Sequence, residues 1–144
     1  MSAPENRERP TEGELIGIAL EAMKTAYAPY SGFLVGAALE TEDGKIYTGR
    51  NIENASYGAT VCAERTAFFR AVGEGERNFR RIAVVGGKGG EITSFSWPCG
   101  ICRQVMREFC GDGFEILSFD GNSVASAKLK DLLPSPFSKD ILEP

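Results

Sequence analysis

The feature that most constrains this chain is the placement of its cysteines, because the sequence contains no histidine. Cys62 begins a Cys-Ala-Glu segment, and Cys99 and Cys102 form a Cys-x-x-Cys pair farther along. A zinc ion held by this chain must therefore have thiolate ligands, and three of them leave the fourth tetrahedral position for water, as in catalytic sites. Glu64 lies two residues after Cys62, and a carboxylate beside a metal-bound water suits hydrolytic chemistry. The fold must bring the two segments together.

The length and charge of the chain limit the classes of protein to consider. With 144 residues, of which 42% are hydrophobic and 25% charged, it is expected to form a single catalytic domain over residues 11–144 after a disordered N-terminus, residues 1–10. The net charge of −4 offers no overall positive field for polyphosphate, which counts against a nucleic-acid partner.

The N-terminal residues and the cysteine content indicate a compartment. Residues 1–10 are polar and charged, so no signal peptide is visible, and no apolar run approaches the ~20 residues of a membrane span. Four cysteines without a secretory signal favour a reducing environment, where thiols stay free or bind metal. We therefore expect a cytoplasmic protein that does not bind membranes.

The first half of the chain predicts a helix, a hairpin and a second helix. Thr11 and Glu14 have capping-box spacing at the start of a helix that is expected to end near Ala28, before Pro29. Residues 33–39 and 45–48 read as antiparallel strands joined at Asp43-Gly44, and residues 51–61 as an irregular polar loop. Residues 62–72 are helix-like, with an inner face predicted at Ala63, Thr66, Ala67 and Phe69.

The second half predicts crossover units. Residues 82–85 read as a buried strand, 86–90 as a plain flexible glycine loop, 99–110 as a helix, 114–119 as a strand followed by a turn, and 129–133 as a short amphipathic piece ending at Pro134. Crossovers require parallel neighbours and helices on the faces of the sheet. The predicted fold is thus α/β, a three-layer α/β/α sandwich with a mixed sheet of about five strands.

In this fold Cys62 and Cys99 fall at helix N-termini. Three thiolates and one Zn²⁺ carry a net charge of −1, which the partial positive charge of the helix ends stabilises. The same charge lowers the cysteine pKa values. Arg65, one turn into the first of these helices, is predicted to donate to the sulfurs.

A Cys-x-x-Cys pair alone has other interpretations, namely a redox pair, half of a zinc knuckle, or two core cysteines. Pro98 before the pair and the separate Cys62 segment argue against a redox site. A structural zinc site would need a fourth ligand, and Cys110 lies roughly 12 Å along the helix from Cys102. We interpret Cys110 as a buried core thiol.

Five segments in order resemble the small, zinc-dependent cytidine deaminases. They are Cys-Ala-Glu-Arg-Thr-Ala at 62–67, Pro-Cys-Gly-Ile-Cys-Arg-Gln at 98–104, Tyr-Ser-Gly-Phe-Leu-Val-Gly-Ala-Ala at 30–38, Asn-Ile-Glu-Asn-Ala at 51–55 and Leu-Leu-Pro-Ser-Pro-Phe at 132–137. The resemblance covers roughly residues 12–140. Gly32, Leu34, Trp97 and Ile101 depart from the family pattern, and Trp97 and Ile101 flank the ligand segment.

The resemblance implies a set of site residues. Cys62, Cys99 and Cys102 would bind one Zn²⁺ per chain, with Arg65 beside them, and Glu64 would shuttle protons. For the substrate it implies contacts of Asn51 and Glu53 with the ribose 3′-hydroxyl, of Phe33 with the nucleoside and of the Ala63 backbone with the base, while Tyr57 and Phe137 would reach a neighbouring subunit's pocket in a homotetramer.

The implied activity is hydrolytic deamination of cytidine and 2′-deoxycytidine in pyrimidine salvage, with no organic cofactor. Three alternatives stay open at this point. A blasticidin-type antibiotic deaminase shares the zinc segments but lacks the Asn-Ile-Glu-Asn segment and the arginine after the glutamate. A nucleic-acid cytosine deaminase typically has a His-x-Glu segment and needs a basic track, and a non-catalytic zinc module would make poor use of a positioned glutamate.

Overall fold

A mixed five-stranded sheet forms the centre of the computed structural model, which describes residues 9–142. The strand order is β2-β1-β3-β4-β5. The strands are β1 (Phe33–Thr41), β2 (Ile46–Arg50), β3 (Phe79–Lys88), β4 (Glu115–Phe119) and β5 (Val124–Lys128). Only the β3–β4 pair is parallel among these neighbours, and the other three pairs are antiparallel. The predicted mixed sheet and the antiparallel first hairpin are confirmed.

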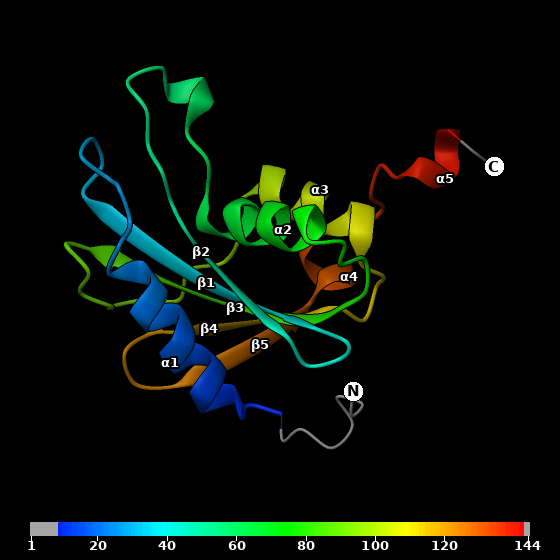
Figure 1. Ribbon diagram of the computed structural model, residues 1–144, viewed down its shortest axis with the longest axis horizontal. Helices are drawn as coiled ribbons and strands as arrows, with labels where there is room; N and C mark the ends of the chain where they lie inside the picture. The colour runs from blue at the N-terminus through cyan, green and yellow to red at the C-terminus, as the bar shows by residue number, and fades with distance from the viewer. Residues whose placement is uncertain (1–8, 143–144) are drawn as a thin grey trace.

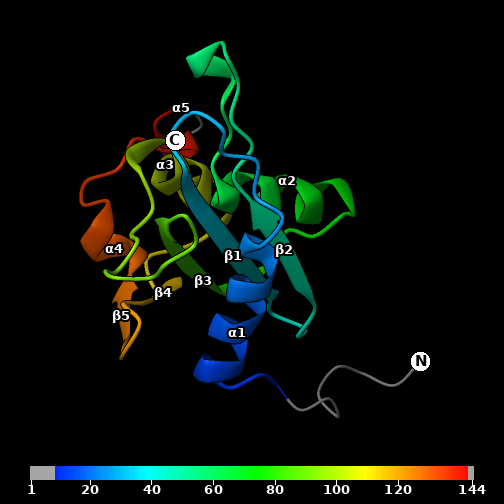
Figure 2. The ribbon, with the colours of Figure 1, turned by 90° about the vertical axis from the view of Figure 1, so that its left-hand side faces the viewer.

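Helices cover both faces of this sheet (Figure 1). Helix α1 (Glu12–Met23) lies on one face, and α2 (Ala63–Gly73) and α3 (Gly100–Phe109) lie side by side on the other, as the turned view in Figure 2 also shows. The remaining short elements are η2 (Tyr57–Ala59), α4 (Leu129–Leu132) and α5 (Lys139–Leu142). Alternate residues of β3 divide between the layers: Ala83 and Val85 pack toward α1, and Ile82 and Val84 toward α2 and α3. The three-layer prediction is confirmed.

Helix α1 begins as predicted and ends earlier. The Thr11 side chain accepts from the Glu14 amide and the Glu14 carboxylate accepts from the Thr11 amide, which completes the capping box. The prediction of an end near Ala28 is wrong, because α1 ends at Met23. The Tyr27 amide donates to the Asn51 carbonyl (2.9 Å), and the Tyr27 carbonyl accepts from the Glu53 amide (2.8 Å). These two hydrogen bonds hold the segment around Tyr27 at the edge of the sheet, so the helix has already ended before the chain reaches Pro29.

The inner face of α2 differs from the prediction at one residue. Phe69 is 53% exposed, whereas Phe68 is fully buried and packs edge-on against Phe79 with ring centroids 5.0 Å apart. Ala63, Ala67 and Ala71 define the buried stripe at intervals of four residues. At 100° per residue, Phe68 lies beside this stripe and Phe69 is turned out of it. The assignment of Phe69 to the inner face is therefore wrong.

The glycine-rich segment after residue 85 is only partly a loop. Gly86 and Gly87 continue β3, which ends at Lys88, and Gly89 and Gly90 form the turn with positive φ. A Cβ atom on Gly87 would lie 1.9 Å from the Glu91 carbonyl oxygen. Close backbone approach, rather than flexibility, accounts for glycine there. The expectation of a plain loop over residues 86–90 is wrong for its first half.

The start of the described chain is fastened to the sheet. Arg9 pairs with Glu40 (2.7 Å), and Arg81 donates to the Pro10 carbonyl (2.6 Å) and to Glu40 (2.7 Å). Of the N-terminus predicted to be disordered, residues 1–8 lie outside the described residues. Within residues 9–142, no helix is long and apolar enough to cross a membrane.

Candidate active site and metal centre

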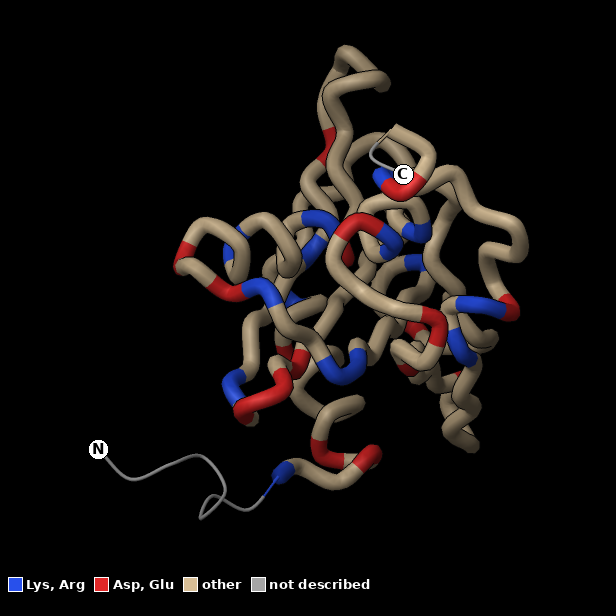
Figure 3. Tube along the Cα trace, turned by 90° about the vertical axis from the view of Figure 1, so that its right-hand side faces the viewer, with Lys and Arg blue, Asp and Glu red and all other residues tan. Residues whose placement is uncertain are grey.

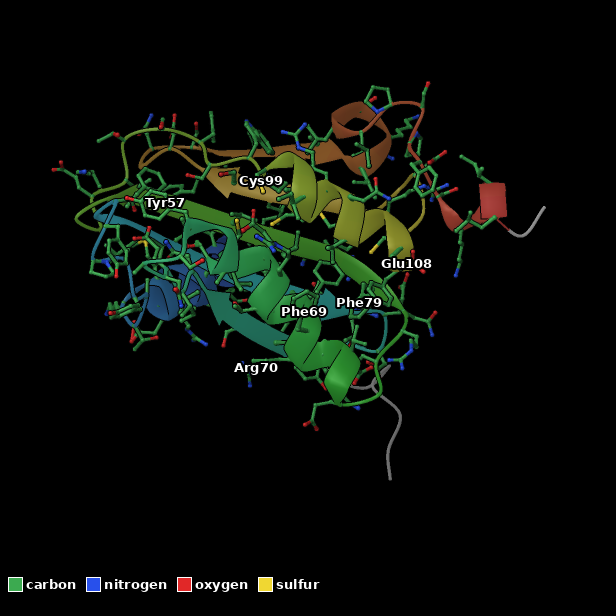
Figure 4. All side chains as sticks on the ribbon, turned by 90° about the horizontal axis from the view of Figure 1, so that it is seen from above. Tyr57, Phe69, Arg70, Phe79, Cys99 and Glu108 are labelled. Atoms are coloured by element: carbon green, nitrogen blue, oxygen red, sulfur yellow. The ribbon has the colours of Figure 1, made fainter. Side chains whose placement is uncertain are left out.

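Two helix N-termini bring the three predicted cysteine ligands together. Cys62 caps α2, Cys99 caps α3, and Cys102 lies in the first turn of α3. Figure 4 labels Cys99 at the start of its helix. An antiparallel bridge between Ile52 and Val61 aligns the chain just before Cys62. The three Sγ atoms all lie within 4.8 Å of one another.

The spacing of these sulfurs fits a zinc ion. Thiolates about 2.3 Å from one tetrahedral Zn²⁺ lie about 3.8 Å from each other. The Sγ atoms of Cys62 and Cys99 are 3.7 Å apart. Three protein ligands without a fourth make an open site, in which one coordination position is left for a small ligand. Among the described residues, these three form the cluster able to hold such an ion.

Hydrogen bonds and charge prepare the cluster for a cation. A hydrogen bond with the Cys102 thiol lowers the pKa of Cys62 to about 5 against the opposing effect of burial, and Arg65 contributes in the same direction. The pKa of Cys102 is raised, because it shares that bond and is buried. The Arg65 guanidinium donates to the Cys62 sulfur through Nη2 (3.5 Å). The hydrogen bond from Arg65 favours the thiolate form of Cys62, the form in which a cysteine binds a metal.

Cys110 is separate from the cluster. It follows the last turn of α3, is buried among apolar side chains, and has its pKa raised chiefly by that burial. Its carbonyl accepts from Arg107 (3.1 Å). This is the position of a core thiol.

Glu64 lies in the first turn of α2, two residues after Cys62. It is 4% exposed, yet its side chain lines the cavity that the cluster borders. Burial raises the pKa of Glu64 to about 7, the Cys62 charge adds to the effect, and a backbone hydrogen bond and Arg65 oppose it. The helix start thus presents a ligand and a carboxyl group to the same space.

The cavity beside the cluster has a volume of about 510 Å³. The residues that line it include Glu64, Ala63 and the N-cap residues Cys62 and Cys99. The predicted residues Phe33, Asn51 and Glu53 line one side, and the irregular segment 94–97 lines another. The size suits a nucleoside-sized molecule, since small-molecule sites are typically ~300–1,000 Å³.

Asn51 and Glu53 are held by the backbone of the neighbouring segment. The side-chain Oδ1 of Asn51 accepts from the Val35 backbone amide (2.9 Å), and its Nδ2 donates to the Phe33 backbone carbonyl (2.8 Å). Glu53 accepts from the Tyr30 and Ser31 amides (both 3.0 Å) and from the Ser31 hydroxyl, which lowers its pKa. Both side chains are thereby fixed at the cavity wall.

Tyr57 and Phe137 lie away from this cavity in their own chain. Tyr57 belongs to η2 at the tip of a projecting loop (Figure 1) and is 77% exposed. Its ring lies edge-on to the Tyr30 ring, with centroids 6.1 Å apart. Phe137 is 58% exposed, and its carbonyl accepts from the Gln104 side chain (2.8 Å). One chain does not bring these two residues to the site.

Sequence reasoning missed most of the segment 94–97 as a cavity wall. Trp97 was singled out only as a departure from a family pattern, and its place beside the ligand Cys99 was the available signal. Ser31 and Thr60 also line the cavity. Ser31 lies in the segment 30–38 that resembles the family, whereas nothing in the sequence context of Thr60 marks it. Ile101, the other flanking departure, is 62% exposed and does not line the cavity.

Comparisons with known proteins agree on one family. Residues 10–115 match the family described as "Cytidine and deoxycytidylate deaminase zinc-binding region". A cytidine deaminase of Sporosarcina psychrophila is 47% identical over 130 residues, covering 90% of this chain and 93% of its own length. One from Mycobacterium tuberculosis is 41% identical over 128 residues, covering 89% and 90%.

Solved structures give the same result. The crystal structure of a cytidine deaminase from Burkholderia pseudomallei superposes with a TM-score of 0.82 at 48% identity, covering 88% of this chain and 99% of that chain. The structure from Mycobacterium tuberculosis has a TM-score of 0.75 at 41% identity, covering 87% and 95%.

Proposed function

This chain belongs to the zinc-binding cytidine and deoxycytidylate deaminase family, and we propose that it hydrolyses cytidine and 2′-deoxycytidine to uridine and deoxyuridine with release of ammonia. The observation that carries the proposal is a cluster of three cysteine sulfurs, two of which belong to residues that line the same cavity as the buried Glu64. A hydrolase acting on an aromatic amine needs an activated water and a proton carrier within reach of the same atom.

Cys62, Cys99 and Cys102 would hold one Zn²⁺ per chain through their Sγ atoms. When bound, zinc supplies a Lewis acid that makes hydroxide available near neutral pH. Arg65 and the two helix N-termini offset part of the thiolate charge.

Glu64 would move the protons of the reaction. Its carboxylate takes a proton from the attacking water and delivers it to N3 of the cytosine ring, which makes C4 more electrophilic. The same carboxylate then takes the proton of the hydroxyl now attached to C4 and delivers it to the 4-amino nitrogen, which leaves as ammonia as the C4 carbonyl of uridine forms. The burial of Glu64 beside the cavity, which shields its carboxyl group from bulk solvent, supports this role.

The cavity walls would bind the nucleoside. Phe33 offers an apolar surface, the Ala63 backbone lies at the floor near the base, and Asn51 and Glu53 would receive the ribose 3′-hydroxyl. Hydrogen bonds with the backbone already hold the Asn51 and Glu53 side chains in place. These side chains would therefore bind the sugar with little further loss of conformational entropy.

The alternative functions have weaker support. A blasticidin-S deaminase of Bacillus cereus is 29% identical over 131 residues, well below the cytidine deaminases. A nucleic-acid deaminase would need a basic track, and Figure 3 shows acidic and basic residues interspersed along the described chain.

We further propose a homotetramer that serves pyrimidine salvage in the cytoplasm. The loop of Tyr57 rises above α2, and the segment of Phe137 extends sideways past α3 toward α5 (Figure 1). Both aromatic side chains are exposed, and aromatic residues are enriched at protein interfaces. The four free cysteines are consistent with a reducing compartment.

Ultraviolet absorbance tests the proposed substrate. Purified, zinc-loaded protein is incubated separately with cytidine, deoxycytidine, CMP and blasticidin S. Loss of the cytosine absorbance with the two nucleosides supports the proposal. Turnover of blasticidin S but of neither nucleoside would contradict the proposal and indicate an antibiotic deaminase.

A further inference from the structure

One wall of the cavity is an irregular segment that lacks main-chain support of its own. Residues 94–97 belong to no helix or strand, and they include Phe95 and Trp97, whose rings are 6.0 Å apart. Within the described chain, no main-chain to main-chain hydrogen bond reaches these residues. A wall of this kind keeps its position only through side-chain bonds and packing.

The Ser118 hydroxyl supplies the shortest of those bonds. Ser118 lies in β4, is fully buried, and is paired in register with Val84 of β3, which itself lines the cavity. Its Oγ donates to the Val84 carbonyl (2.8 Å) and accepts from the Ser96 amide (2.9 Å). A hydroxyl has one proton to donate and lone pairs to accept, so both bonds form at once. Ser118 therefore joins the wall to the central strand.

Ser96 and Phe33 both pack closely against the backbone of Gly86 in β3. The Ser96 hydroxyl is 3.4 Å from the Gly86 carbonyl, to which it donates. A Cβ atom on Gly86 would lie 3.0 Å from the Ser96 oxygen and 2.9 Å from the Phe33 ring. Because Gly86 has no side chain, Phe33 on one wall of the cavity and Ser96 on the other can both approach β3 closely.

We propose that Ser118 is a positioning residue, whose buried hydroxyl sets the place of Phe95 and Trp97 in the substrate cavity. The proposal rests on the proposed function for its kinetic consequence only. Removal of the hydroxyl leaves the amide of the half-buried Ser96 without its acceptor, and the segment shifts to reach another acceptor or water. Contacts made by a wall act on the bound nucleoside and on the transition state alike, so their loss raises KM more than it lowers kcat.

Trp97 is the only tryptophan of the chain, so its fluorescence reports the wall directly. In zinc-loaded Ser118→Ala, acrylamide quenching of this fluorescence should rise at least about twofold, because the segment has lost its shortest hydrogen bond to the sheet. The KM for cytidine should rise about five- to tenfold, with kcat changed less than about threefold. Ser118→Thr keeps the hydroxyl and should retain both values near wild type.

A matched control removes another buried hydroxyl. Thr41 is 1% exposed at the far end of β1 from the cavity, and its Oγ1 accepts from the Lys45 amide (2.9 Å). Thr41→Val should lower thermal stability while leaving Trp97 quenching and KM unchanged. If Ser118→Ala does not fold, Ser118→Cys replaces it, because a thiol of similar shape accepts only weakly.

Three results would overturn the proposal: unchanged quenching in folded Ser118→Ala, an equal rise in Thr41→Val, or a rise in Ser118→Thr as large as in the alanine variant. Quenching is measured without substrate. A failure of cytidine turnover would therefore count against the proposed function and leave the wall measurement intact.

Discussion

The Sγ atoms of Cys62 and Cys99 lie 3.7 Å apart, although the two residues cap different helices and are 37 positions apart in the chain. The strand β3 passes between these helices in sequence and runs through the centre of the sheet. The crossover from α2 through β3 to α3 therefore returns the chain to the same end of the sheet. The cysteine cluster is a product of this topology.

Replacing any one ligand should release the metal. Cys99→Ala or Cys102→Ala leaves two thiolates, which are too few for a stable Zn²⁺ site. Mass spectrometry of the purified proteins should find zinc largely lost together with activity. Cys110→Ala is the matched control on the same helix, and it should retain zinc at a cost of about 1 kcal/mol from the cavity it creates. Full zinc content in Cys99→Ala would remove Cys99 from the ligand set.

Free nucleosides should be preferred to nucleotides. The Glu53 carboxylate lies at the cavity wall, and the neighbouring Lys88 amino group is already engaged with the Ser31 carbonyl (2.6 Å). A 5′-phosphate near this carboxylate is repelled, so kcat/KM for CMP should be at least about tenfold below that for cytidine. Competition assays with both substrates measure the ratio directly. Equal turnover would show that Glu53 faces away from the phosphate position.

The buried Glu40 should make stability depend on pH. Its carboxylate is fully buried; burial alone would raise its pKa, but hydrogen bonds from Arg81 and Arg9, with the charges of Arg81 and Arg80, hold the pKa below the usual 4.5. Glu40→Gln should lower the free energy of unfolding at pH 7 by roughly 3 kcal/mol. Urea unfolding gives this value.

The sign of the pH effect follows from the lowered pKa. At pH 7 Glu40 is ionised in both states and its stabilisation is complete. Below about pH 4.5 the unfolded chain binds a proton first, so the difference between wild type and Glu40→Gln should shrink. A difference that stays constant or grows on acidification would contradict the assignment. Glu21→Gln, which breaks an exposed pair with Lys24, should change stability by less than about 1 kcal/mol.

Phe137 should act on a neighbouring subunit. Its exposed ring lies on a segment that leaves the chain's own core after Pro134 and Pro136. Phe137→Ala and Glu64→Gln homotetramers should each have low activity. Mixed tetramers should recover activity, because intact Glu64 sites borrow the aromatic ring from neighbours. A monomer by light scattering, or no recovery while subunits demonstrably exchange, would argue against a shared site.

Local patterns predicted most of the fold. The capping box of Thr11, the hairpin at Gly44 and the two helices behind the cysteines depend on neighbouring residues, and the structure contains all of them. The end of α1 could not be predicted in this way, since the bonds of Tyr27 to Asn51 and Glu53 join distant segments. The strand character of Gly86 likewise depends on tertiary packing.

The candidate site likewise has a part that local sequence patterns predict and a part that depends on tertiary structure. Cys62, Glu64, Cys99 and Cys102 were visible from residue type and spacing, because metal chemistry restricts both. The wall around Trp97 and its bond to Ser118 were not, since a serine in a strand carries no signal of its partner. Only the register of β4 against β3 reveals that bond.

The central claim is that Glu64 carries the protons of cytidine hydrolysis, and one comparison tests it most directly. Wild type and Glu64→Gln are matched for zinc content, and uridine and ammonia formation from cytidine are measured at saturation. Loss of a general acid–base should lower kcat at least ~10²-fold, while zinc content and the melting temperature stay near wild type. Turnover by zinc-loaded Glu64→Gln within tenfold of wild type would place the proton transfer elsewhere and contradict the account.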